Sequence, residues 1–120
     1  MTLDALRAYC LAKPGVTEET PFDAVTLVYK VAGKMFALTG LHDDPLELNL
    51  KCDPERAADL REQYAAVRPG YHMNKTHWNT VVADGSVRDS LLREWIDHSY
   101  DLVKSSLPKA KRLALETGEI

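Results

Sequence analysis

The chain has 120 residues, which fits one domain built around a single hydrophobic core. Its hydrophobic content of 45% and charged content of 28% are typical of a globular protein and exclude a disordered or collagen-like chain. Acidic residues outnumber basic ones by 18 to 15, and the formal net charge of -3 differs from the strongly basic balance of most dedicated nucleic-acid-binding domains.

Membrane and redox features of the sequence favour the cytoplasm. No apolar run approaches the roughly 20 residues that span a bilayer. The first residues, Met1 to Asp4, lack the basic start and the apolar centre of a signal peptide. We therefore expect a cytoplasmic protein that has no membrane partner and in which Cys10 and Cys52 stay reduced. Two cysteines alone define neither a disulfide framework nor a metal site.

The first part of the chain predicts a helix and then a hairpin. Apolar residues recur at helical spacing from Leu3 to Leu11, after Thr2, which can cap the helix. From Val25 to Val31 apolar residues alternate with polar ones. A turn at Gly33-Lys34 then leads into a second strand from Met35 to Leu38, so the two segments are expected to pair as a hairpin.

Another strand and a second helix follow. The segment from Leu46 to Lys51 alternates without interruption, which predicts a strand with its leucines facing the core. Asp53 can cap the next helix, and Pro54 suits its first position because the missing N–H needs no partner there. The expected packing face of this helix consists of Ala57, Leu60 and Tyr64.

The second half of the chain predicts another hairpin and a long helix. Asn74-Lys75-Thr76 is typical of a hairpin tip, and the residues from Trp78 to Val82 alternate in the strand that follows. Ser86 with Asp89 three residues later resembles a capping box, so a helix is expected to begin there. The apolar stripe of this helix comprises Val87, Leu91, Leu92, Trp95, Ile96, Tyr100 and Val103.

The order of these elements indicates the fold class. Helix, strands, helix, strands and helix together predict an α+β domain in which a mostly antiparallel sheet packs against helices. The segment from Lys109 to Ile120 has no sustained apolar face and is expected to fray. We therefore expect a single domain over residues 1–113 and a frayed tail over 114–120. No glycine-rich turn joins a strand to a helix, which argues against P-loop or Rossmann nucleotide binding.

The segment from Pro69 to Val81 is the densest in functional side chains. No acidic residue lies between Gln63 and Ala83, whereas this stretch contains Arg68, Lys75, two histidines and two large aromatic residues. In a chain of net negative charge, such a gap makes a local electropositive region. It is the first place to look for a binding partner.

Several motifs together resemble the MmcQ/YjbR family of small bacterial proteins, from Met1 to about Leu113. They are Tyr9-Cys10 with Ala12-Lys13-Pro14-Gly15, Leu48 to Lys51 followed by Pro54-Glu55, Asp84-Gly85-Ser86 with Ser99-Tyr100, and above all Val67-Arg68-Pro69 through Val81. The resemblance implies a frataxin-like sandwich and the role proposed for the family, DNA binding through a "double-wing" arrangement of hairpins. Frataxin-like iron binding is not implied, because the first helix has only Asp4 where an acidic ridge would be needed.

The leading hypothesis is therefore a non-enzymatic DNA-binding protein that needs no cofactor and uses a basic hairpin around Lys75. The Lys75 ammonium at the tip would meet a phosphate, with Asn74 and Thr76 adding hydrogen bonds. Trp78 would stack on a base if it faced solvent. The net charge of -3 predicts weak, salt-sensitive binding. The expected contact residues are Lys75, Asn74, His77, Arg68, His72, Trp78 and Thr76.

Several of these residues could have a structural role instead of a contact with DNA. The phase of Trp78 in its strand favours core packing, with the indole N–H satisfied internally. A lysine at a loop tip is ordinarily solvated and has no further role. Asn74 and Asn79 are residue types that stabilise turns through side-chain hydrogen bonds to the backbone. A second basic group would add to the surface if it lay near the hairpin, although the favoured interpretation is a solvated helix end stabilised through the macrodipole. That group consists of Lys104, Lys109, Lys111 and Arg112.

Two other function classes stay open at this point. If the four residues between His72 and His77 form the hairpin loop, the imidazoles become cross-strand neighbours with Cβ atoms about 5 Å apart. Zinc takes three or four protein ligands, and this segment offers no cysteine or carboxylate. A metal-dependent enzyme using His72 and His77 is therefore the less favoured alternative, since Cys52, Asp84 or a second subunit would have to supply the other ligands. A Cys-His nucleophilic pair is also disfavoured, because Cys10 lies in the apolar stripe of a helix. The alternative to DNA is an acidic protein or a small anionic ligand on the same surface.

Overall fold

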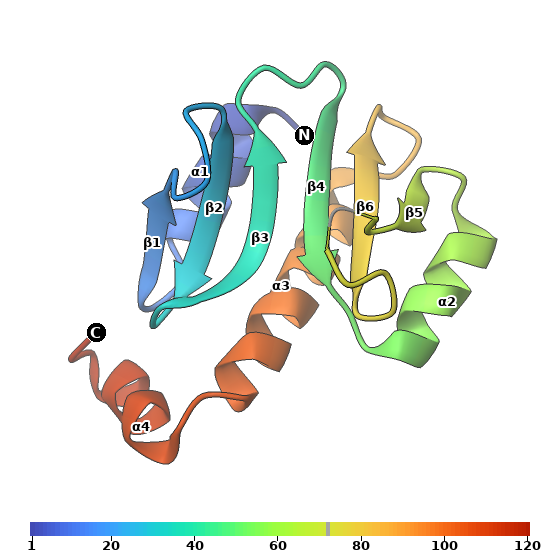
Figure 1. Ribbon diagram of the computed structural model, residues 1–120. Coiled ribbons are helices and arrows are strands. Elements are labelled where there is room, and N and C mark those ends of the chain that lie inside the picture. Colours follow the sequence, from blue (N-terminus) through green and yellow to red (C-terminus); the bar gives the residue numbers. More distant parts are fainter. Residues whose placement is uncertain (72) are drawn as a thin grey trace.

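The computed structural model describes residues 1–71 and 73–120, which form one six-stranded sheet and four α-helices (Figure 1). The strands are β1 (Val16–Glu19), β2 (Thr26–Val31), β3 (Lys34–Gly40), β4 (Leu46–Lys51), β5 (Val67–Pro69) and β6 (Trp78–Ala83). The helices are α1 (Leu3–Leu11), α2 (Pro54–Gln63), α3 (Asp89–Ser105) and α4 (Lys109–Thr117). Neighbouring strands are antiparallel throughout the order β1-β2-β3-β4-β6-β5. The predicted α+β fold with an antiparallel sheet is confirmed.

The main core lies between one face of the sheet and the helices behind it (Figure 1). Leu6 of α1 and Ile96 of α3 are fully buried there against Tyr29 and Leu48 of the strands. α4 adds Leu115, which is 4% exposed. α2 lies beside β5 at the edge of the sheet. Within the described residues, none of the helices is long and apolar enough to cross a bilayer.

The opposite face of the sheet, which we call the open face, has no helix layer in Figure 1. A small cluster of Val28, Leu38 and Trp78 is buried on it, with Met35 and Met73 packed around the three. Val28 and Leu38 share this face because they pair in the β2–β3 register. Along each strand, such residues alternate with residues that face the main core. The open face therefore offers a partly apolar surface beside the polar side chains of β4, β5 and β6.

Most of the predicted elements are confirmed. α1 begins after Thr2, whose hydroxyl accepts a hydrogen bond from the Ala5 N–H at 3.1 Å. The strands of the first hairpin pair as expected, and the leucines of β4 are buried. Asp53 caps α2 by accepting from the Arg56 N–H at 3.2 Å. In β6, Trp78 and Thr80 lie on the open face, whereas Val81 lies in the main core and Val82 is partly buried against that core.

The predicted start of the long helix is wrong. The Ser86 hydroxyl donates to Asp84 Oδ1 at 2.6 Å and therefore stabilises the turn after β6 instead of capping a helix. α3 begins three residues later at Asp89, and Arg88 at its N-cap makes no side-chain capping bond. Ser and Asp compete for turn hydrogen bonds as readily as for helix caps, so their spacing alone did not separate the two.

Two elements were not predicted. The tail from Lys109, which was expected to fray, forms α4, because Leu115 packs into the core and Gly118 ends the helix with a φ of 78°. β1 was not predicted at all, although Val16 follows Gly15 directly and pairs with Val31. A strand of four residues with only half of its side chains partly buried carries too short a pattern to detect.

A buried serine ties α3 to two strands. Ser99 is fully buried, and its hydroxyl donates to the Phe36 carbonyl at 2.5 Å and accepts from the Lys51 N–H at 2.9 Å. Phe36 lies at an irregularity of the β2–β3 ladder, where Tyr29 pairs with Ala37 and the next residue pairs with Met35. The serine thus satisfies backbone groups that the sheet itself leaves free.

Candidate nucleic-acid interface

Three chain segments with lysines lie at one end of the sheet. Because β2, β4 and β5 run in one direction and β3 and β6 in the other, the β2–β3 turn, the last residue of β4 and the β5–β6 connection share that end (Figure 1). These segments contribute Lys34, Lys51 and Lys75 respectively. Lys34 and Lys51 were not among the predicted contact residues, because their position depends on the direction of strands far apart in sequence.

The β5–β6 connection is held by Asn74. Its side-chain Oδ1 accepts from the Thr76 N–H at 2.9 Å and the His77 N–H at 3.3 Å, and its backbone carbonyl accepts from the Trp78 N–H at 2.9 Å. These bonds favour the turn-holding interpretation of Asn74, since the side-chain oxygen is already used. Lys75, Thr76 and His77 are exposed around the turn. The fold thus presents the Lys75 side chain outward from a fixed backbone.

The lysines at this end have no acidic partner in the described part of the chain. The ion pairs found there involve other basic groups, and Lys34, Lys51 and Lys75 take part in none of them. An unpaired ammonium keeps its full charge for a ligand, whereas a paired one must first release its carboxylate. The charge at this end is therefore available for an anion.

The basic residues of α4 join the same end of the sheet. The Lys111 ammonium donates to the carbonyl of Ala32 in the β2–β3 turn at 3.3 Å, which fixes the start of α4 beside that turn. Lys109 and Arg112 are exposed next to it. We call Lys34, Lys51, Lys75, Lys109, Lys111 and Arg112 together the basic end.

The position of these residues within α4 corrects an expectation. A basic group is favourable at a helix C-terminus, but Lys109, Lys111 and Arg112 occupy the first turn of α4, which has no acidic residue. Cations there oppose the helix macrodipole. Only Lys104, in the last turn of α3, has the helix-stabilising position that was expected for the whole group. Helix stability therefore does not account for the basic start of α4.

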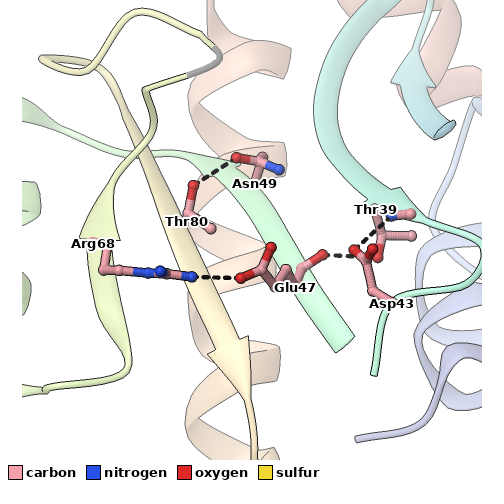
Figure 2. Close-up of polar contacts among 7 residues, drawn as sticks. Thr39, Asp43, Glu47, Asn49, Arg68 and Thr80 are labelled. Carbon is pink, nitrogen blue, oxygen red and sulfur yellow. Dashed lines mark hydrogen bonds and ion pairs between the residues drawn. The ribbon is translucent and has the colours of Figure 1, made fainter. Parts of the chain in front are cut away.

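Arg68 lies apart from the basic end. Its guanidinium forms an ion pair with the Glu47 carboxylate across β6, and the Thr80 hydroxyl beside it donates to Asn49 Oδ1 at 2.8 Å, as Figure 2 shows. All four side chains project on the open face. The structure thus separates Arg68 from Lys75, with which it was expected to form one patch.

Trp78 is also different from the predicted contact residue. It is 8% exposed and packs in the small cluster of the open face, so its ring is not available for stacking on a base. The neighbouring Asn79 is buried as well. Its side-chain NH₂ group donates to the Ala57 carbonyl at 3.3 Å and its Oδ1 accepts from Arg61 at 2.7 Å, which fastens α2 to β6. Both side chains have structural roles.

The histidines and cysteines offer no reactive centre among the described residues. His72 lies outside them, and within them no three His, Cys, Asp or Glu side chains lie close enough together to hold a metal ion. His98 accepts from the Asp53 N–H at 3.2 Å, and burial lowers its pKa. Burial also raises the pKa of the Cys10 thiol to about 12 and raises that of Cys52, so neither is prepared to act as a thiolate.

Comparisons with known proteins give the family. The chain is 39% identical over 115 residues to the uncharacterized protein YjbR of Escherichia coli strain K12, which spans 96% of this chain and 98% of the relative. It is 36% identical over 99 residues to the uncharacterized protein YbdF of Escherichia coli O157:H7, over 82% of this chain and 80% of the relative.

Solved structures agree with this relationship. A crystal structure of a Deinococcus radiodurans protein with a DUF419 domain superposes with a TM-score of 0.91 at 45% identity, over 96% of this chain and 88% of that one. A Pseudomonas syringae protein superposes with a TM-score of 0.74 at 26% identity, over 86% of this chain and 99% of that one. The model of the YjbR family matches residues 11–102, and the chain therefore belongs to the YjbR family.

Proposed function

We propose that this protein binds DNA through the basic end of its sheet. The observation that carries the proposal is that two turns far apart in sequence, with Lys34 and Lys75, lie at the same end of the sheet and have no acidic partner among the described residues. The basic first turn of α4 lies beside one of them. Several ammonium groups on one surface match the repeated negative charge of a phosphate backbone.

The chemistry of the basic end predicts binding without sequence preference. Lysines on flexible stems contact phosphates as mobile point charges and read no base edges. Asn74 is the amide nearest the tip, and its oxygen is engaged by the backbone of its own turn. Trp78 is buried and supplies no stacking surface. We therefore expect weak contact with the DNA backbone, whose affinity is governed by salt.

The test is the salt dependence of binding to a fluorescent duplex DNA, measured by anisotropy. Each phosphate that is neutralised adds about 0.9 to the slope of log affinity against log salt. The double variant Lys34→Ala/Lys75→Ala is expected to bind more weakly at low salt and to lose about 2 units of slope. The control is Arg88→Ala, which removes one positive charge from the exposed loop at the opposite end of the sheet. That variant should keep the slope of the unmodified protein.

Two results would contradict the proposal. One is the absence of DNA binding at low salt. The other is an equal loss of slope in the Arg88→Ala control, which would mean that only net charge matters. A basic end that prefers an acidic peptide would bind a poly-glutamate probe more tightly than duplex DNA at the same salt concentration, and that outcome would favour the protein-interaction alternative.

A further inference from the structure

A groove crosses the open face of the sheet. Its larger part has a volume of about 540 Å³ and lies over β3 and β4 beside the loop before β2. Its smaller part has a volume of about 190 Å³ and lies over β5 and β6. Glu47 and Asn49 line both parts, so the two hollows lie side by side. The larger part alone falls within the range of about 300–1,000 Å³ that is typical of small-molecule sites.

The larger part of the groove is acidic. Asp23, Asp43 and Glu47 line it, and the described residues that surround it include no lysine or arginine. Asp23 is committed to its own loop, since it accepts from the N–H groups of Val25 and Thr26 at 2.9 and 2.7 Å. Asp43 accepts one bond, from the Gly40 N–H at 3.2 Å (Figure 2). Its exposed carboxylate therefore has room for a further donor.

Apolar side chains also line the groove, whereas its smaller part includes the polar residues Arg68, Asn49 and Thr80. Leu38 and Met73 line the larger part together with Phe22, which is 63% exposed. Tyr71, which is 72% exposed, lines the smaller part. The faces of exposed aromatic rings attract cations. Apolar walls and carboxylates thus occur in the same depression.

We propose that this groove binds an organic cation, a molecule that joins an ammonium group to a flat apolar body. The apolar body would lie on Leu38 and Phe22 while the ammonium meets the carboxylate of Asp43, because that of Glu47 is paired with Arg68. A metal ion does not fit, because no three acidic, His or Cys side chains of the described chain converge on one point. A phosphate does not fit either, since the larger part of the groove presents only negative charge. The larger part of the groove therefore differs from the DNA surface in charge, although Met73 and Tyr71 of the β5–β6 connection line the groove.

The experiment is a titration of the ¹⁵N-labelled protein with tryptamine, followed by NMR. Tryptophol is the matched neutral probe, because it replaces the ammonium of tryptamine with a hydroxyl and keeps the indole. We expect saturable shifts at Asn49 and Thr39 with a dissociation constant of about 1 mM, the order expected for a ligand of this size. Tryptophol is expected to bind about fivefold more weakly.

Variants separate the charge from the apolar surface. Asp43→Asn should weaken tryptamine binding by about twofold to fivefold and leave tryptophol unchanged, because a partly screened ion pair contributes that much. Phe22→Ala should weaken both probes, and its exposure means that the fold does not depend on it. Asp59→Asn, which removes an exposed charge from α2, is the control and should change neither.

The proposal is overturned by any of three results. Shifts that do not saturate at about tenfold above the expected dissociation constant would exclude the site. Equal affinity for tryptamine and tryptophol would exclude a preference for cations. Shifts located at the basic end or among the helices would place the binding elsewhere.

Discussion

Replacing Ser99 by Ala is expected to lower the free energy of unfolding by about 3 kcal/mol, because it leaves two buried backbone groups without a partner. The hydroxyl serves the Lys51 N–H and the Phe36 carbonyl, and the site is fully buried, so water cannot replace it without opening the core. Urea unfolding followed by circular dichroism gives the value directly. The variant should show a lower midpoint with an unchanged slope.

Ser105→Ala is the matched control in the same helix. Ser105 is exposed, and its hydroxyl donates only to the Leu102 carbonyl within α3, at 2.9 Å. Its loss is expected to change the stability by no more than about 0.5 kcal/mol. If Ser99→Ala were equally mild, the bonds from α3 to β3 and β4 would contribute little, and packing alone would hold the helix on the sheet.

Gly70→Ala is expected to cost about 3 kcal/mol through steric conflict. An added Cβ would lie 2.8 Å from the Trp78 Cβ and 2.9 Å from the Trp78 carbonyl oxygen. Trp78 is held by its pairing with Lys51, so β6 cannot move aside without breaking the ladder to β4. The Gly70 N–H also donates to the same carbonyl at 2.8 Å, and the backbone at Gly70 must stay close to β6 to keep this bond. Thermal unfolding of the variant measures the loss.

Gly33→Ala provides a contrast that separates sterics from backbone conformation. Gly33 has a φ of 89° and no atom within 4 Å of an added Cβ, so the expected cost is the backbone penalty of about 1 kcal/mol. A Gly70→Ala variant as stable as the unmodified protein would show that β5 can shift away from β6. Alanine lowers the conformational entropy of the unfolded chain, which would by itself make Gly70→Ala stabilising. The sign of the change in stability therefore shows whether the steric conflict at Gly70 dominates.

The sequence predicted those elements whose patterns are local. The unbroken alternation of β4 and the capping of α2 by Asp53 depend only on neighbouring residues, and both were predicted correctly. α4 was missed because one residue, Leu115, anchors it to a core built from distant strands. The start of the long helix at Ser86 was predicted wrongly because the Ser86 hydroxyl forms a hydrogen bond within the turn. The residue types alone do not distinguish that bond from a helix cap.

The sequence predicted the exposed turn around Lys75 but not the other residues of the candidate site. Lys75 is the exposed tip that the acid-free segment indicated, and Asn74 holds its turn. The position of Lys34 at the same end of the sheet follows from strand direction, and the pairing of Arg68 with Glu47 brings together residues 21 apart in sequence. Both depend on how the strands pair in the folded sheet, which the local sequence pattern does not predict.

The two proposals give the molecule two surfaces of opposite charge. The basic end carries lysines without acidic partners, and the groove of the open face is lined by Asp23, Asp43 and Glu47. This separation explains how a chain with a net charge of -3 can attract a polyanion to one place and repel it from another.

The most direct test of DNA binding at the basic end is an NMR titration of the ¹⁵N-labelled protein with duplex DNA at low salt. The account predicts shifts at the amides of Lys34, Lys75 and Lys109 that reverse when salt is added. The amides of Asn49 and Thr80, on the floor of the groove, should stay unchanged. Shifts at the groove with none at the three lysines would contradict the account.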